Sequence, residues 1–267
     1  MEYSRKEHYE IEKELSVRLK SASPEERRGL YSEVYDELFR RVPGHPMLRN
    51  KQDDGSRLDH VQGQLKLLKP YLNEHTNFLE IGAGDCKLVF AIAEIAESAK
   101  AVDVSREISQ SERVPDNFEL VITEGVELPI EDESVDIAYS DQLIEHIHPD
   151  DVEMHLDNVY RILVPRGIYL CITPSRISGP HDVSKYFSSH AEGMHLREYS
   201  FSDLRKKLNR AGFRRFKYVI GAKGFFSTVP VGLVELFERI VSRLPKRIAK
   251  LPVIRTLLSV RILAIKG

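Results

Sequence analysis

A glycine turn flanked by two carboxylates has the residue types of a ligand site. Gly82-Ala83-Gly84 directly follows a short apolar segment, 78–81, which contains Glu80. Glycines after a buried strand let the backbone bend tightly and approach a ligand, and the next helix N-terminus can hold an anionic group. Asp103 ends a second apolar segment about 20 residues further on, the place from which a carboxylate accepts hydrogen bonds from ribose hydroxyls.

Two details separate this turn from a dinucleotide-binding turn. The dinucleotide pattern has a third glycine three residues after the second, whereas this chain has Lys87 there. Glu80 lies just before the turn, where its carboxylate would repel a pyrophosphate but suits an amine or a hydroxyl group. The ligand indicated is a nucleoside with a cationic, amino-acid-like tail. A NAD(P)-dependent oxidoreductase remains the alternative.

Alternating apolar segments predict the elements that hold this turn. Ser23-Pro24-Glu25-Glu26 has the pattern of a capping box and starts a helix that should end near residue 42. A polar loop over 50–57 and a helix over 58–72 follow. The rest predicts a doubly wound, seven-stranded, mostly parallel α/β sheet, whose ligands bind at the carboxyl ends of the strands. The predicted strands are 78–81, 100–104, 118–122, 135–139, 168–173, 213–220 and 260–265.

Further motifs follow the glycine turn in a fixed order: Glu-Gly-Val-Glu-Leu-Pro at 124–129, Leu-Ile-Glu-His-Ile at 143–147, a Pro-Arg-Gly turn at 165–167, and Ala-Gly-Phe at 211–213. Together they resemble the class I S-adenosylmethionine-dependent methyltransferases, in the small-molecule type 11/12-like branch. The sequence departs from that family at Cys86, where a third glycine is common, and at Arg166, where Pro-Gly-Gly is usual.

The resemblance implies a Rossmann-like methyltransferase domain over 76–267, a helical extension or lid over 1–75, and S-adenosyl-L-methionine as cofactor. Gly82 and Gly84 would lie against its methionine part and Asp103 would hold the ribose. Glu124 would pair with the adenine amino group, and Asp141 would border the acceptor pocket. Taken singly, Glu80 and Asp103 could also be structural acids. The predicted cofactor-binding residues are Glu80, Gly82, Ala83, Gly84, Asp103, Val104, Glu124, Gly125 and Asp141.

Three histidines, His146, His181 and His195, are candidate bases for an acceptor that must lose a proton. A histidine near the place of His146 acts as the base in several similar O-methyltransferases, although His146 could instead cap its helix. The other two lie in the long connection 174–199, where Asp182 could orient His181. The spacings of His181, His190 and His195 match no strong ligand pattern, so no metal site is predicted.

We therefore expect S-adenosylmethionine-dependent O-methylation of a small-molecule, sugar or lipid-linked acceptor, by in-line displacement. Besides the oxidoreductase, a non-catalytic S-adenosylmethionine-binding or scaffold protein is an alternative. The chain has two cysteines, which cannot build a disulfide framework, and its N-terminus has no apolar signal segment, so a cytoplasmic protein is expected. Its near-neutral total, from 39 basic and 41 acidic residues, indicates no nucleic-acid partner.

That near-neutral total hides a strongly polarised chain. Residues 1–196 hold 22 basic and 37 acidic side chains, whereas residues 197–267 hold 17 basic and 4 acidic ones. The segment 221–259 is predicted as a basic, amphipathic helical insertion before the last strand. Its stretch 233–258 could touch the inner face of a membrane, pack on its own domain, or form a homodimer contact. Its apolar stripe comprises Leu233, Leu236, Phe237, Ile240, Val241 and Leu244.

Overall fold

Helices precede the first strand of the sheet, as the sequence predicts. The computed structural model describes residues 4–45, 48, 54–104, 114–222 and 225–267. In α2, Ser23 forms the predicted capping box with Glu26, but the helix is interrupted at Gly29, whose backbone N–H donates to the Glu124 carbonyl over 2.8 Å. Residues 50–53 of the predicted loop 50–57 lie outside the described residues, and 54–57 are helical, because the helix after it starts at Asp54. These elements are α1 (Arg5–Ser21), α2 (Pro24–Arg41), α4 (Asp54–Leu68) and η1 (Lys69–Tyr71).

The core of the molecule is one sheet with the strand order β3-β2-β1-β4-β5-β8-β6-β7. The first five strands are parallel to one another, and β8, β6 and β7 pair in antiparallel fashion beside β5. All carboxyl ends of the parallel strands therefore meet at one edge. The strands are β1 (Asn77–Ile81), β2 (Ser98–Asp103), β3 (Phe118–Ile122), β4 (Val135–Asp141), β5 (Leu163–Thr173), β6 (Arg215–Ala222), β7 (Phe225–Val229) and β8 (Val260–Ile265).

The described chain has eight strands rather than the predicted seven. The additional strand, β7, pairs with β6 and occupies the start of the segment predicted as a helical insertion. Its sequence, Phe-Phe-Ser-Thr-Val, is aromatic and β-branched, which suits an edge strand. The helical part of the insertion then follows as α8 (Val231–Val241), α9 (Lys246–Ala249) and α10 (Pro252–Leu258). The predicted turn at 165–167 lies inside β5, where the pairing with β4 is irregular.

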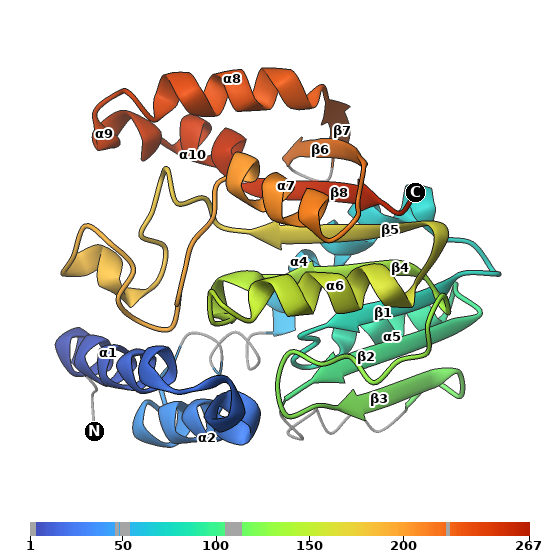
Figure 1. The fold of residues 1–267 in the computed structure, drawn as a ribbon, viewed down its shortest axis with the longest axis horizontal. Helices are drawn as coiled ribbons and strands as arrows, with labels where there is room; N and C mark the ends of the chain where they lie inside the picture. Colours follow the sequence, from blue (N-terminus) through green and yellow to red (C-terminus); the bar gives the residue numbers. More distant parts are fainter. Residues whose placement is uncertain (1–3, 46–47, 49–53, 105–113, 223–224) are drawn as a thin grey trace.

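Helices cover both faces of the sheet, as a doubly wound arrangement requires (Figure 1). Helix α6 (Val152–Ile162) and α7 (Phe201–Arg210) pack on one face, through fully buried residues such as Leu156 and Leu204. Helix α5 (Lys87–Ala93) and α4 cover the other face, where Val89 and Leu68 are buried. Two short helices, η2 (Ile144–His146) and η3 (Val183–Tyr186), lie in the connections after β4 and β5. No helix within the described ranges is both long and apolar enough to span a bilayer.

Candidate cofactor and acceptor site

The glycine turn joins the carboxyl ends of β1 and β2. Gly82 and Gly84 have φ angles of 75° and 58°, in the left-handed region that glycine tolerates best. The Gly82 N–H donates to the Val102 carbonyl over 2.8 Å, and the Gly84 N–H donates to the Asp103 carboxylate over 2.8 Å. A Cβ atom on Gly82 would lie 3.0 Å from Cδ1 of Leu143, so the turn also fits closely under the segment after β4.

A cleft opens at this edge of the sheet, above the turn. It is bordered by the ends of β1 and β2, the loop after β3, the segment after β4, and α2. The cleft thus has the position at which open α/β sheets bind ligands. The predicted site residues that line it are Gly82, Gly84, Asp103, Val104, Gly125 and His146.

The other predicted cofactor residues lie near the cleft in different settings. Ala83, within the turn, and Glu80, just before it, are buried. The Glu124 side chain is exposed. Asp141 accepts hydrogen bonds from Gln64 of α4 over 3.1 Å and from the Tyr139 hydroxyl over 3.2 Å. The hydrogen bond from Gln64 connects the end of β4 to α4.

Helix α2 forms one wall of the cleft through Tyr31, Tyr35 and Phe39. The Tyr31 hydroxyl donates to Asp151 over 3.0 Å and accepts the His148 N–H over 2.9 Å. Arg27 adds a buried bidentate pair with Asp151, with contacts of 2.7 and 2.5 Å. These bonds fix α2 to the segment after β4 and so set the width of the cleft.

Two of the three candidate catalytic histidines meet at the far end of the cleft. The rings of His146 and His195 are edge-to-face, with centroids 4.9 Å apart. Nδ1 of His146 lies 2.9 Å from the Met194 carbonyl oxygen, and Nδ1 of His195 lies 2.9 Å from Oε1 of Glu198. Each ring therefore has one nitrogen held by an acceptor, and only His146 borders the cleft itself.

Glu145, which the sequence analysis did not single out as a site residue, completes this cluster. It is fully buried, and its Oε2 accepts a hydrogen bond from the Thr173 hydroxyl over 2.9 Å. Its Oε1 has no hydrogen-bond partner among the residues that the structure describes. Burial raises the pKa of Glu145 to about 7 and lowers that of His146 to about 3. Burial also lowers the pKa of His195, but the hydrogen bond to Glu198 and the charge of Glu145 outweigh it, so that pKa is raised.

His181 lies apart from this cluster, and its predicted orientation by Asp182 is wrong. Asp182 instead caps η3, accepting the N–H groups of Ser184 and Gly193 over 3.0 Å each. Nε2 of His181 lies 3.0 Å from the Ser175 carbonyl oxygen, and burial lowers its pKa. The Asp182 carboxylate accepts from the backbone N–H groups of Ser184 in η3 and of Gly193 further along the connection, and not from the His181 ring.

His155 of α6 lines the cleft and was not predicted as a site residue. It is buried, and its Nε2 has no partner among the described residues. Burial lowers its pKa to about 4, so the ring is neutral near pH 7. In the sequence it lies among the apolar positions of a helix, which is why it was indistinguishable from a core residue.

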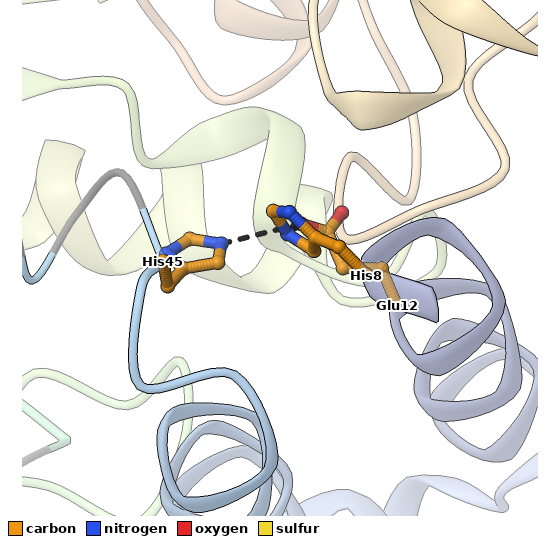
Figure 2. Close-up of side chains that lie close together, drawn as sticks. All are labelled: His8, Glu12 and His45. Atoms are coloured by element: carbon orange, nitrogen blue, oxygen red, sulfur yellow. Dashed lines mark hydrogen bonds and ion pairs between the residues drawn. The ribbon is translucent and has the colours of Figure 1, made fainter. Parts of the chain in front are cut away.

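A second cluster, shown in Figure 2, ties α1 to the same region. Oε1 of Glu12 lies 2.6 Å from Nε2 of His8 and 3.2 Å from Nε2 of His45. Its other oxygen accepts the Met194 N–H over 3.0 Å. Although burial favours the protonated carboxyl, these bonds hold the pKa of Glu12 well below its usual range. Met194 thus connects Glu12, through its N–H, with His146, through its carbonyl.

Known proteins resemble this chain over the region that builds the cleft. Residues 79–171 match the family model described as a methyltransferase domain. The ubiquinone/menaquinone biosynthesis C-methyltransferase UbiE of Brucella canis is 24% identical over 180 residues, which are 62% of this chain and 64% of that relative. The match thus spans less than two thirds of the relative's length.

Solved structures show the same fold at lower identity. An S-adenosylmethionine-dependent methyltransferase from Thermotoga maritima has a TM-score of 0.54 and 19% identity, covering 83% of this chain and 99% of that one. Haemonchus contortus phosphoethanolamine N-methyltransferase 1 was solved with phosphoethanolamine and S-adenosylhomocysteine. It has a TM-score of 0.58 and 17% identity, and the match covers 92% of this chain and 50% of that one. The family match and this fold agree: residues 79–171 match a methyltransferase domain, and the sheet around them has the fold of solved S-adenosylmethionine-dependent methyltransferases.

Proposed function

We propose that this protein transfers the methyl group of S-adenosylmethionine to an oxygen atom of a hydroxyl-bearing acceptor. The observation that carries the proposal is the placement of His146 in the same cleft as the glycine turn and Asp103. The turn and Asp103 suit the methionine and ribose parts of the cofactor. The polar cluster of Glu145, His146 and His195 at the far end suits an acceptor hydroxyl group.

The cofactor would lie along the carboxyl ends of β1 to β3. Asp103 would accept hydrogen bonds from the ribose hydroxyls, and the loop containing Gly125 would border the adenine. His155 supports this placement, because its ring is neutral and lines the cleft together with Gly125 and Val126. Its Nε2 can then accept a hydrogen bond, for example from an adenine amino group.

The transfer itself is an in-line displacement. A lone pair of the acceptor oxygen attacks the methyl carbon, and the carbon–sulfur electron pair moves to the sulfur, which leaves S-adenosylhomocysteine. The donor is already activated, so the protein mainly positions the partners and excludes water. Tyr31, Tyr35 and Phe39 suit that task, and we infer that residues 1–75 act as a lid.

We further propose that the acceptor is lipid-linked and that the protein reaches it at an anionic membrane surface. Leu233, Leu236, Ile240 and Leu244 of the predicted apolar stripe are between 44% and 58% exposed, while Val234 and Val241 face the protein. Figure 1 shows α8 at the edge of the molecule opposite α2. From Phe225 onward the chain has eight basic and two acidic residues, a balance that attracts anionic lipids.

A second cavity supports an acceptor route from this surface. It lies between the connection after β5 and the insertion, and its lining includes Arg197, Glu198, Leu244 and Lys246. Glu198 also holds His195, which contacts His146 in the cofactor cleft. The cavity thus lies beside the exposed stripe and shares Glu198 with the contacts that reach the candidate acceptor end of the cleft.

The test is methyl transfer to candidate acceptors, with the modified atom identified. The purified chain is incubated with isotope-labelled S-adenosylmethionine and with hydroxyl-bearing lipids and glycolipids in anionic vesicles. The proposal expects a labelled methyl ether. A labelled methyl group on carbon would instead support a reaction like that in the name of the Brucella relative. Labelled S-adenosylmethionine that binds without any transfer would favour a non-catalytic binding protein.

A further inference from the structure

Three side chains of the kinds that bind transition metals meet at the end of the cofactor cleft. One ligand atom each from Glu145, His146 and His195 lies within 4.8 Å of the others. Glu145 and His195 are buried and His146 is half-buried. Two imidazoles and one carboxylate are the ligand set of several catalytic zinc sites and of non-haem iron sites.

Hydrogen bonds orient both imidazoles as they do in metal sites. Nδ1 of His195 is held by the Glu198 carboxylate, and Nδ1 of His146 is held by the Met194 carbonyl oxygen, each over 2.9 Å. When Nδ1 donates to such an acceptor, the lone pair of the neutral ring is on Nε2, available to a metal ion. The two rings therefore have the tautomers that metal binding needs.

The Glu145 carboxylate has one oxygen available to bind a metal ion. Oε2 of Glu145 is fixed by the Thr173 hydroxyl, whereas Oε1 is buried and has no hydrogen-bond partner in the described part of the chain. A buried carboxylate oxygen without a partner is costly, and a bound cation removes that cost. From the three side chains together, we propose that Glu145, His146 and His195 bind a divalent transition-metal ion such as Zn²⁺.

The spacing of the three ligand atoms allows this with small side-chain movements. Ligand atoms around one tetrahedral Zn²⁺ ion lie about 3.3 Å apart, since each is about 2.0–2.2 Å from the metal. The three ligand atoms here lie within 4.8 Å of one another, so binding would draw them closer by at most about 1.5 Å. Binding through Oε1 of Glu145 and Nε2 of His195 would leave the hydrogen bonds to Thr173 and Glu198 intact.

The cluster of His8, Glu12 and His45 also groups ligand atoms, but it fits a metal ion less well. Both oxygens of Glu12 already accept hydrogen bonds, from the two histidine rings and from the Met194 N–H. This carboxylate is satisfied: it lies between His8 and His45 (Figure 2) and accepts the N–H of Met194 in the connection after β5. Glu145, with its unpartnered oxygen, is the carboxylate that would gain more from a cation.

The role of the ion rests on the proposed function. An acceptor hydroxyl that binds the ion beside His146 becomes more acidic, as metal-bound water does. Its O–H bond breaks and the proton passes to solvent water. The resulting oxygen lone pair then forms the bond to the methyl carbon, while the carbon–sulfur pair goes to sulfur. The two histidines would hold the ion rather than take the proton.

Direct Zn²⁺ binding by the full chain tests this site without the reaction. The chain is stripped with a chelator and titrated with Zn²⁺ against a competing indicator, with S-adenosylhomocysteine binding as the control for folding. We expect one tight site per chain. Glu198→Gln should weaken it about 10–100-fold, the range for a residue that orients a ligand. Both Glu145→Gln, which keeps an oxygen for Thr173, and His195→Ala should weaken it more.

His190→Ala is the matched control, since His190 is an exposed histidine of the same connection. It should leave Zn²⁺ binding unchanged. The proposal is overturned if the wild-type chain binds no stoichiometric Zn²⁺, if the Glu145 and His195 variants bind as tightly as wild type, or if His45→Ala removes the site. Zn²⁺ bound at this cluster without any methyl transfer would contradict only the proposed function. Methyl transfer by a chain that binds no Zn²⁺ would contradict only the metal site.

Discussion

The backbone N–H of Gly84 donates a hydrogen bond to the carboxylate of Asp103 over 2.8 Å. This bond joins the turn after β1 to the end of β2, so the two strongest sequence signals are in direct contact. It orients the Asp103 carboxylate at the border of the cleft. The same residue is thus placed both to stabilise the turn and to accept hydrogen bonds from a ribose.

Replacement of Asp103 by alanine should weaken cofactor binding. Hydrogen bonds to a charged group contribute about 1.5–3 kcal/mol, so we expect roughly a tenfold to hundredfold rise in the Kd for S-adenosylhomocysteine, measured by calorimetry. Asp103→Asn keeps one acceptor oxygen and should lose less. Equal affinity of the wild-type and Asp103→Ala chains would remove the ribose assignment.

Gly82→Ala should disturb the turn strongly, although the substitution adds only one methyl group. A φ of 75° costs a non-glycine residue about 1–2 kcal/mol, and the new Cβ would lie 3.0 Å from Leu143. We expect a lower free energy of unfolding and weaker binding of S-adenosylhomocysteine. Gly63→Ala in α4 is the control, because nothing lies within 4 Å of its Cβ position and alanine favours a helix. If both variants were as stable as wild type, the turn would not have the geometry described here.

The Arg27–Asp151 pair should make the free energy of unfolding decrease at acidic pH. Burial raises the pKa of Asp151, but hydrogen bonds from Arg27 and Tyr31 outweigh this and lower it, with His148 adding attraction. The pair therefore stabilises the fold above the unfolded-state pKa of about 3.9, and this contribution is lost as the pH falls through the lower folded-state pKa. Asp151→Asn leaves Arg27 buried and unpaired, so we expect a loss of about 3–5 kcal/mol near pH 7 by urea unfolding. A variant as stable as wild type near pH 7 would contradict this.

The exposed face of α8 should bind anionic vesicles. Leu236 and Ile240 are 50% and 52% exposed, so Leu236→Glu with Ile240→Glu should remove binding in a flotation assay without loss of stability. Val17→Glu, at a 57% exposed position of α1, is the control and should float like wild type. If the double variant also floats like wild type, α8 is not the contact. If wild type fails to float and elutes as a dimer, the face joins two copies instead.

Much of the fold could be predicted from local patterns. Strands β1, β4 and β5 contain apolar runs because they are buried between two layers of helices, and the capping box of α2 is a short-range signature. β7 was missed because it has only five residues and no alternation of buried and exposed side chains, so its local sequence did not separate it from the predicted helical insertion.

Only those parts of the site that belong to a single local motif could be predicted from the sequence. The glycine turn and Asp103 follow directly from their positions after strands. The meeting of His146 with His195 depends on the path of the connection after β5, which the contact between Glu12 and Met194 fixes across the length of the chain. His155 and Glu145 were not predicted because their pKa values and unpartnered atoms depend on burial, which the sequence alone does not reveal.

The binding of S-adenosylhomocysteine to the wild-type chain tests the central claim most directly. We predict one site per chain by titration calorimetry, with thermal stabilisation that rises with ligand concentration, because the ligand binds only the folded state. NAD and NADP should produce neither effect. Stabilisation by NAD or NADP, with no response to S-adenosylhomocysteine from a folded chain, would contradict the account.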